Sequence, residues 1–332
     1  MTDLRPLLLA VLAACTGSKP ADDTGAREAP IGETDTDTDP VTTPPTEPTG
    51  EACGDEICKE PYHCVYCARA PPDSGVPYEG FYLCVEEDVT CGRPLRTCAG
   101  RAVASVRGDV PGTGDARALA DLWLTLALEE HASIASFARQ ALALMAHGAP
   151  LDLVARTQRA SLDEVRHAQA ALALARRFAG AELALGAIPL ARVDMPRDLA
   201  ALAVETFVDG CLGETLATAV AVRARQRATD PDVIAALDDV IRDETRHAAL
   251  AWATVAWAIP AGGPSVADAV EAAWRAWSPP APRFDHAEHL AGFGAWSAAD
   301  ERAALVDARA AVLEPAVAAL LGAVGGRPVA TA

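Results

Sequence analysis

The sequence spells one pentapeptide pattern twice, as Asp163-Glu164-Val165-Arg166-His167 and as Asp243-Glu244-Thr245-Arg246-His247. Each copy places a glutamate and a histidine three positions apart, and on a helix such residues share a face. One carboxylate and one imidazole would therefore point at one spot in each copy, which predicts a site for two metal ions. The four ligands from the two copies would be Glu164, His167, Glu244 and His247.

A further glutamate precedes each copy at nearly the same distance. Glu130 lies 34 residues before Glu164, and Glu214 lies 30 residues before Glu244. A turn signal with a proline separates the two members of each pair. This internal repeat predicts two consecutive helical hairpins, with Glu130 and Glu214 as the remaining metal ligands.

Both of these glutamates have rivals nearby. Glu129 adjoins Glu130, but Glu130 lies in the apolar stripe of its helix and Glu129 does not. Glu205 and Asp209 precede Glu214 on the third helix. Glu205 lies nine residues from Glu214, about 180° round a helix, so the two cannot both face the metals. Only Glu214 repeats the spacing of the first hairpin.

The ligand pattern resembles that of the ferritin-like di-iron carboxylate superfamily, in which two helices each supply a glutamate and two others each supply a Glu-x-x-His. The doubled Asp-Glu-x-Arg-His string is similar to that of bacterial multicomponent monooxygenase hydroxylases. Glu-His-Ala-Ser at 130–133 and Cys-Leu-Gly-Glu-Thr at 211–215 also resemble uncharacterised ferritin-like lipoproteins of myxobacteria. The resemblance covers about residues 115–260. It implies an all-α fold, a ferritin-like four-helix bundle of two hairpins with a long crossover.

The resemblance also implies supporting contacts for the ligands. Asp163 and Asp243 would each hydrogen-bond the histidine of the opposite motif, and Arg166 and Arg246 would neutralise these aspartates. Four carboxylates and two neutral imidazoles bring a charge of about −4, which two ferrous ions cancel. The predicted cofactor is therefore two iron ions, with manganese as the alternative metal. The competing interpretation is an exposed charged face on two helices, which gives no reason for the motif to repeat in register.

The boundaries of the four helices follow from their periodicity and turn signals. The first helix is expected from Asp115 to about 147, and the second from 151 to 179, where Gly180 ends it. An extended crossover would follow. The third helix is expected to start around Asp194-Met195-Pro196, and the fourth to run from 231 to 258 and end at Pro260.

The first residues resemble a bacterial lipoprotein signal. Arg5 precedes an apolar run, residues 6–14, that is too short to span a bilayer, and Leu12-Ala13-Ala14-Cys15 resembles a lipobox. We therefore expect a signal peptide over 1–14, lipidation at Cys15, and a place in the bacterial cell envelope, in the outer membrane and facing the periplasm or the surface. A plain signal peptide with an incidental cysteine, or a wrongly assigned start codon, are the alternatives.

Residues 15–52 are rich in Thr, Pro and Asp, which predicts a lipid-anchored disordered linker. Calcium binding by the alternating aspartates at 34–39 is the less favoured alternative. Residues 53–100 then hold a cysteine-rich module. Because an exported protein reaches an oxidising compartment, we predict that these cysteines form disulfides. Its seven candidates are Cys53, Cys58, Cys64, Cys67, Cys84, Cys91 and Cys98. Because seven is odd, either one of them pairs with Cys211 or two thiols stay free. A zinc or redox role for Cys64 and Cys67 is the alternative.

The remaining segment, 261–325, is expected to form helices at 265–277 and about 298–321 that pack on the bundle. His286 and His289 lie between them, either as packing or surface residues or as a second metal site. The net charge of −18 and the isoelectric point near 4.7 argue against binding to nucleic acid or to anionic lipid. Any membrane attachment would then be through the N-terminal lipid only.

Together these features predict an exported lipoprotein whose non-haem di-iron carboxylate centre oxidises a substrate or iron with dioxygen or peroxide. Hard oxygen ligands suit this chemistry because they stabilise ferric iron. The alternative hypothesis is a non-catalytic bundle that binds metal or sequesters iron and carries the cysteine-rich module, whose partner would be another protein.

Overall fold

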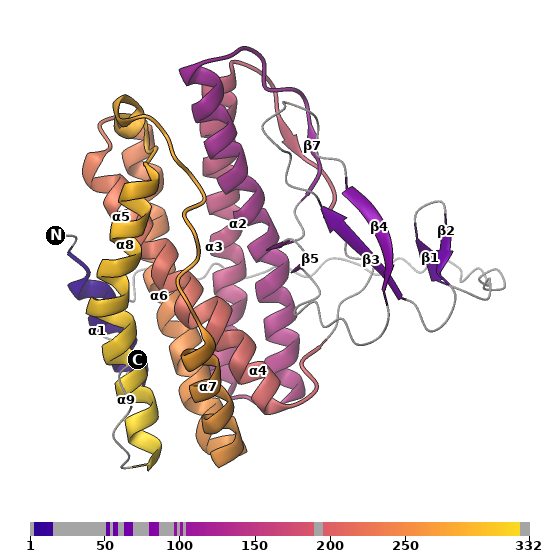
Figure 1. Ribbon diagram of the computed structural model, residues 1–332, viewed down its shortest axis with the longest axis vertical. Coiled ribbons are helices and arrows are strands. Elements are labelled where there is room, and N and C mark those ends of the chain that lie inside the picture. The colour runs from indigo at the N-terminus through magenta and orange to yellow at the C-terminus, as the bar shows by residue number, and fades with distance from the viewer. Residues whose placement is uncertain are drawn as a thin grey trace, which may run out of the picture.

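The computed structural model describes residues 3–15, 104–188 and 195–325, and the backbone of short strands between 51 and 101. The described chain is mostly helical, in agreement with the all-α prediction (Figure 1). Three long helices dominate it: α2 (Asp115–Ala146), α3 (Leu151–Ala179) and α6 (Pro231–Gly262). A fourth helical arm is continuous in the chain but changes type along its length. It consists of α4 (Leu199–Glu205), the π-helix η1 (Thr206–Glu214) and α5 (Thr215–Arg227).

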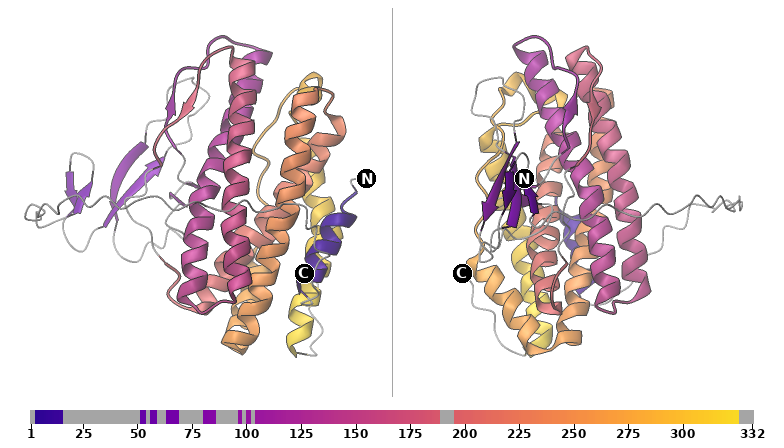
Figure 2. Two further views of the ribbon diagram at one scale, coloured as in Figure 1. Left: turned by 180° about the vertical axis from the view of Figure 1, so that it is seen from behind. Right: turned by 90° about the vertical axis from the view of Figure 1, so that its right-hand side faces the viewer.

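The helices form two consecutive hairpins that lie side by side (Figures 1 and 2). Helix α2 packs along α3, and the α4–η1–α5 arm packs along α6. Helix α3 joins the two hairpins because it also contacts α6. Arg177 near the end of α3 strengthens this junction by pairing with Asp230 at 2.7 Å, and Asp230 in turn caps the start of α6.

The predicted ends of the first two helices agree with the structure. Helix α3 ends where expected, because Gly180 adopts a left-handed conformation with φ of 60° and its N–H donates to Arg176. Two other predicted boundaries were wrong. The third helix begins at Leu199, since the side chain of Asp198 accepts a hydrogen bond from the N–H of Ala201 and caps it there.

Helix α6 also runs past the predicted end. Pro260 lies inside the helix, which continues to Gly262. A proline near the end of a helix removes one backbone hydrogen bond but leaves the following turn free to form from its own residues. Beyond α6 the chain forms α7 (Pro264–Ala276), the 3-10 helix η2 (Glu288–Phe293) and α8 (Ala298–Ala308). The π-helix η3 (Arg309–Leu313) and α9 (Glu314–Gly325) follow. The predicted helix at 298–321 is therefore interrupted by a π-helical turn.

Short antiparallel strand pairs lie outside the helical hairpins. Strand β7 (Val106–Arg107) pairs with β8 (Ala184–Leu185), so the segment after α3 is anchored to the segment before α2. Gly108 allows this approach, since a Cβ there would lie 2.4 Å from the carbonyl oxygen of Glu182. The remaining strands are β1 (Glu51–Cys53), β2 (Glu56–Cys58), β3 (His63–Ala68), β4 (Gly80–Val85), β5 (Arg96–Thr97) and β6 (Gly100–Arg101).

These six strands pair in sequence order as three hairpins, β1 with β2, β3 with β4 and β5 with β6. The register of β3 and β4 places Cys64 opposite Cys84 in the backbone ladder. The predicted disulfides of this module and the predicted linker over 15–52 lie outside the residues whose side chains the structure describes. The side chains of Cys15 and Cys211 are described; both are buried, and neither forms a disulfide in the described structure.

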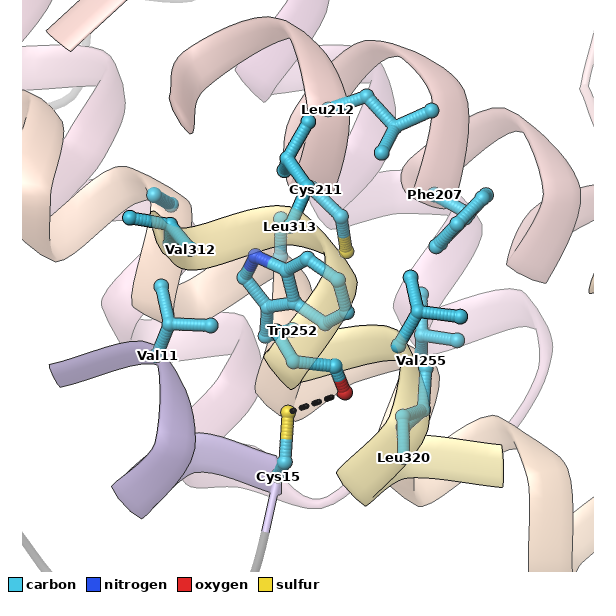
Figure 3. Packing of buried hydrophobic residues seen from close by; sticks show 14 of the residues in the cluster. Val11, Cys15, Phe207, Cys211, Leu212, Trp252, Val255, Val312, Leu313 and Leu320 are labelled. Atoms are coloured by element: carbon cyan, nitrogen blue, oxygen red, sulfur yellow. Dashed lines mark hydrogen bonds between the residues drawn. The ribbon is translucent and has the colours of Figure 1, made fainter. Parts of the chain in front are cut away.

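The N-terminal segment forms helix α1 (Arg5–Cys15), which lies against α6, η3 and α9. Figure 3 shows Val11 and Cys15 facing Trp252 and the aliphatic side chains of the C-terminal helices. Burial raises the pKa of the Cys15 thiol to about 12, and the thiol donates a long hydrogen bond to the carbonyl of Ala316 at 3.9 Å. Lipidation of Cys15 needs an accessible thiol, so α1 would have to leave this place before the predicted processing.

Signal cleavage and lipidation stay predictions, since the structure describes the uncleaved chain. Within the described ranges, no helix has both the length and the apolar composition that a bilayer crossing requires.

Candidate metal centre

The doubled motif lies at mid-height of the two hairpins. Glu130 comes from α2, Glu164 and His167 come from α3, and Glu244 and His247 come from α6. Apolar layers enclose this level on both sides. One layer holds Leu128, Leu174 and Leu237, and the other holds Phe137, Leu153 and Leu250, all buried. The polar ligands therefore lie in a section of the hairpins from which water is largely excluded.

The two imidazoles direct the same ring atom at the central carboxylates. Nδ1 of His247 lies 3.0 Å from Glu164 and 3.4 Å from Glu244. Nδ1 of His167 lies 3.3 Å from Glu244, 3.6 Å from Glu130 and 3.8 Å from Glu164. Glu164 and Glu244 thus each contact both histidines, so both carboxylates lie between the two imidazoles.

Four of the six predicted ligands have donor atoms that lie within 4.8 Å of one another: Glu130, Glu164, His167 and Glu244. His247 joins them through its contacts with Glu164 and Glu244. The sixth residue, Glu214, lies next to His247 on the wall of a small cavity. The structure therefore brings all six predicted residues together, four in one tight group and two at its side.

Glu214 reaches the centre from the last position of the π-helix η1. The two rivals considered from the sequence lie elsewhere. Glu205 forms an ion pair with Arg139 of α2 at 2.9 Å and ties the two hairpins together. Asp209 is buried beside the centre and lines a cavity there.

Each histidine is held from behind by the aspartate of the opposite motif. Nε2 of His167 lies 3.2 Å from Asp243, and Nε2 of His247 lies 3.2 Å from Asp163. Because an ionised carboxylate only accepts hydrogen bonds, Nε2 of each ring must carry the proton. When the ring is neutral, its Nδ1 lone pair is directed into the carboxylate cluster, where a metal would lie.

The arginines of the motif complete this crossed arrangement. Arg166 contacts Asp243 at 2.7 Å as well as Asp163 of its own helix at 2.8 Å. Arg246 contacts Asp163 at 3.3 Å and Asp243 at 2.7 Å. These are the contacts that the resemblance implied. Arg242, whose Nε lies 3.0 Å from Asp243, was not among the residues expected from the sequence. The sequence does place an arginine directly before the second motif, whereas a leucine precedes the first.

The charges at the centre shift the pKa values strongly. Burial would lower the pKa of His167, but the carboxylates of Glu130, Glu164 and Glu244 raise it to about 12. The pKa of His247 is likewise raised against burial by Glu244, Asp163 and Glu164. Burial and the neighbouring charge of Glu164 raise the pKa of Glu130. Without metal, protons therefore balance the carboxylates, and a bound metal would displace them.

Asp163 lies behind His247 and does not face the carboxylate cluster. Burial would raise the pKa of Asp163, but hydrogen bonds with His247 and Arg166 lower it to about 2. This carboxylate is thus a charged acceptor at neutral pH.

The centre also contains polar atoms without hydrogen bonds. Glu164 Oε2, His167 Nδ1 and His247 Nδ1 are buried and make no hydrogen bond of good geometry within the described part of the chain, although carboxylate oxygens lie as close as 3.0 Å to Nδ1 of His247 and 3.3 Å to Nδ1 of His167. Buried polar groups are normally satisfied, so three such atoms at one point call for an explanation. All three face the space between the carboxylates. A pair of metal ions fits this donor set, because carboxylate oxygens and imidazole nitrogens are ligands of iron and manganese.

A small cavity of about 20 Å³ adjoins the centre on the side of Glu214 and His247. It lies between α2, η1 and α6. Its wall consists of Ser133, Ser136, Phe137, Gln140, Asp209, Gly210, Glu214, His247, Leu250 and Ala251. The sequence analysis considered three of its polar residues, namely Asp209, Glu214 and His247. It did not predict Ser133, Ser136 or Gln140, because the sequence of one helix does not show which serine or glutamine will face a neighbouring helix.

The other histidines do not form a second cluster in the described structure. His289 lies 2.8 Å from Asp115 at the start of α2, and His286 stacks on Phe284. The packing and surface interpretation of these two residues therefore fits the structure better than the second metal site. His131, next to Glu130, has a pKa lowered by burial.

Comparisons of the chain with protein-family models, with curated proteins and with solved structures found no match.

Proposed function

We propose that the chain is an exported lipoprotein with a ferritin-like bundle, whose non-haem di-iron carboxylate centre oxidises a substrate or iron with dioxygen or peroxide. One observation carries the proposal. Glu164 Oε2 and the Nδ1 atoms of His167 and His247 are buried without hydrogen-bond partners in the described part of the chain, at the meeting point of four glutamates.

The ligand residues can do two things for such a reaction. Their carboxylates balance the charge of two divalent ions, so that the ions can lie at a buried level between apolar layers. Glu164 and Glu244 contact both histidines and can hold the two ions close together. When bound, the iron pair would supply the electrons for reducing dioxygen or peroxide.

The surrounding residues orient the ligands and control access. Asp163 and Asp243 hold the proton of each histidine on Nε2, which keeps Nδ1 available at the centre. The apolar layers around Leu128 and Phe137 exclude bulk water. The cavity beside Glu214 offers a small molecule a route to one side of the centre.

The proposal is tested by metal content and turnover together. Purified protein without residues 1–14, reconstituted with ferrous iron under anaerobic conditions, should hold about two iron ions per chain. A pulse of dioxygen in the presence of a reductant should then give sustained oxygen consumption. A single stoichiometric oxidation would instead support the iron-sequestering alternative, and folded protein that binds neither iron nor manganese would refute both.

Glu129→Ala provides a matched control for variants of the ligands. Glu129 is a glutamate on the same helix as Glu130, but it pairs with Arg283 away from the centre. Its loss should leave the metal content unchanged, whereas loss of Glu130 should reduce it.

A further inference from the structure

Helix α1 lies in an apolar groove between α6, η3 and α9, within the segment that is expected to be removed as a signal peptide. Its buried residues are Leu7, Val11 and Cys15, together with Leu4 just before it. These four positions fall within about 80° of one another around a helix, because each residue turns the helix by about 100°. The segment thus has one narrow buried stripe, and this stripe faces the groove.

The wall of the groove is apolar and closed to solvent while α1 is in place. Figure 3 shows Trp252 of α6 and Val312 and Leu313 of η3 around Val11 and Cys15. Each of the three wall residues is 0% exposed. Removal of α1 would bring water to this wall, and a contiguous apolar surface is normally covered in a soluble domain. Helix α1 is therefore the cover of this part of the core.

The first turn of α1 and its outer face also have the features of a helix that belongs to the fold. The side chain of Asp3 accepts a hydrogen bond from the N–H of Arg5 at 3.2 Å, which satisfies one of the free donors at the start of the helix. On the opposite side from the groove, Leu9 is 67% exposed. A signal peptide requires a short apolar run, and this division into a buried and an exposed face is a feature of packing.

The expected modification site lies within the same contact. Cys15 is 8% exposed, and its thiol lies 3.9 Å from the carbonyl oxygen of Ala316. Lipidation would form a thioether bond between Sγ and a glyceryl carbon of a phospholipid, with loss of the thiol proton and departure of the phosphate head group. The thiolate is the attacking species, whereas burial raises the pKa of the Cys15 thiol. The position and the protonation of the thiol both oppose this reaction in the folded chain.

We infer that the groove between α6, η3 and α9 retains α1 in the folded chain and thereby withholds Cys15 from lipidation. A chain that is exported before its bundle closes on α1 is lipidated, whereas a chain that folds first keeps α1 and stays free of lipid. The groove thus divides one polypeptide between an anchored form and a lipid-free form. This inference rests on the export and lipidation proposed above, and it is independent of the metal centre.

Thiol labelling of the full-length, unprocessed chain tests the contact directly. Mass spectrometry follows the reaction of a maleimide with the peptides that contain Cys15 and Cys211. In the folded wild type, Cys15 should react at least about a hundredfold more slowly than in urea, because it reacts only when α1 opens. Cys211, which is 0% exposed, reports whether the rest of the core stays closed. Labelling of Cys15 at the same rate in both conditions would overturn the inference.

Two substitutions on α1 form a matched pair and leave the sequence of the bundle unchanged. Leu7 is 3% exposed, so Leu7→Asp places a charge in the groove and should speed the labelling of Cys15 by at least about tenfold. Leu9→Asp makes the same change on the exposed face and should label like the wild type. Cys211 should stay protected in both variants. Equal labelling of Cys15 in the two variants would show that the groove does not hold α1.

A substitution in the groove tests the consequence in cells, because it leaves the expected signal itself unchanged. Val312→Asp changes the wall beside Val11 and should raise the lipidated fraction of the chain, measured by mass spectrometry of the membrane and soluble fractions. The wild type should contain both forms. Val306→Asp is the matched control, since Val306 on α8 is 67% exposed. Protection of Cys211 in Val312→Asp checks that its bundle still folds, and the pair on α1 decides the contact where it does not.

Complete lipidation of the wild type would overturn the inference and leave the proposed lipoprotein standing. Equal lipidated fractions in the wild type, Val306→Asp and Val312→Asp would have the same meaning. Absence of lipid from all three chains, with Cys15 open to the maleimide in Val312→Asp, would refute lipidation at Cys15 and the inference with it.

Discussion

Replacing Asp243 by asparagine should show how much this aspartate contributes to stability and metal affinity while the six proposed ligands stay unchanged. The side chain of Asp243 is fully buried and lies 3.2 Å from Nε2 of His167. Three guanidinium groups also contact it, those of Arg166 and Arg246 at 2.7 Å and that of Arg242 at 3.0 Å. The substitution leaves all six ligands in place. It removes the negative charge, however, and turns one acceptor oxygen into a donor.

The expected magnitude follows from these contacts. Breaking a buried charge pair costs about 3–5 kcal/mol when the partner stays buried. The three arginine side chains are about half exposed, so they can turn into solvent, and we expect a loss of about 2–3 kcal/mol in unfolding free energy. Loss of the partner of a ligating histidine typically lowers metal affinity or activity by about 10–100-fold.

Asp163→Asn should have the smaller effect of the two. Asp163 is 12% exposed and lies 3.3 Å from Arg246, a longer contact than the corresponding one at Asp243. Its loss should destabilise the fold by about 1–2 kcal/mol. The order of the two variants thus follows from the deeper burial of Asp243 and its additional contact with Arg242.

The assays are urea unfolding of the metal-free chain, metal content after reconstitution, and the rate of reoxidation after reduction. Asp239→Asn is the matched control, because Asp239 lies on the same helix and pairs with Arg242 at 2.8 Å but contacts no histidine in the described structure. It should change stability by less than about 1 kcal/mol. Asp243→Asn and Asp239→Asn with equal stability, equal metal content and equal reoxidation rates would show that the aspartate behind His167 does not support the centre.

Three other changes test separate parts of the structure. Glu164→Ala combined with Glu244→Ala should reduce the metal content from about two ions per chain to none, as measured by elemental analysis, and retention of both ions would refute the assignment of these two residues as ligands. Cys15→Ser should release the protein from the membrane fraction, and unchanged fractionation would refute lipidation at this position. Gly210→Ala should destabilise the fold by about 1–3 kcal/mol in urea unfolding, since its Cβ would overlap a neighbouring helix. Gly213→Ala, whose Cβ would have no neighbour closer than 3.7 Å among the described residues, should cost less than that, and equal losses would contradict the close contact.

The sequence by itself determined the level of the Glu/His cluster along the helices and most of the residues that meet there. A Glu-x-x-His pair must share a helix face, and two similar spacings from Glu130 and Glu214 require two similar hairpins. These constraints are local, because they depend only on the rise and turn of an α-helix. The ends of α2 and α3 follow in the same way from Gly180 and the turn around Pro150.

Other features depend on contacts between segments far apart in the chain. Whether residues 206–214 form an α-helix or a π-helix depends on how closely η1 can approach α6, and nothing in the segment alone states this. From the sequence, Asp209 is only an alternative to Glu214 as the ligand from the third helix, and the repeat spacing favours Glu214. Only the π-helix puts both carboxylates on one cavity, and only its contact with Ala251 shows why position 210 holds a glycine. The asymmetry between Asp163 and Asp243 arises likewise from tertiary structure, since two similar local patterns acquire different burial when each packs against a different neighbour.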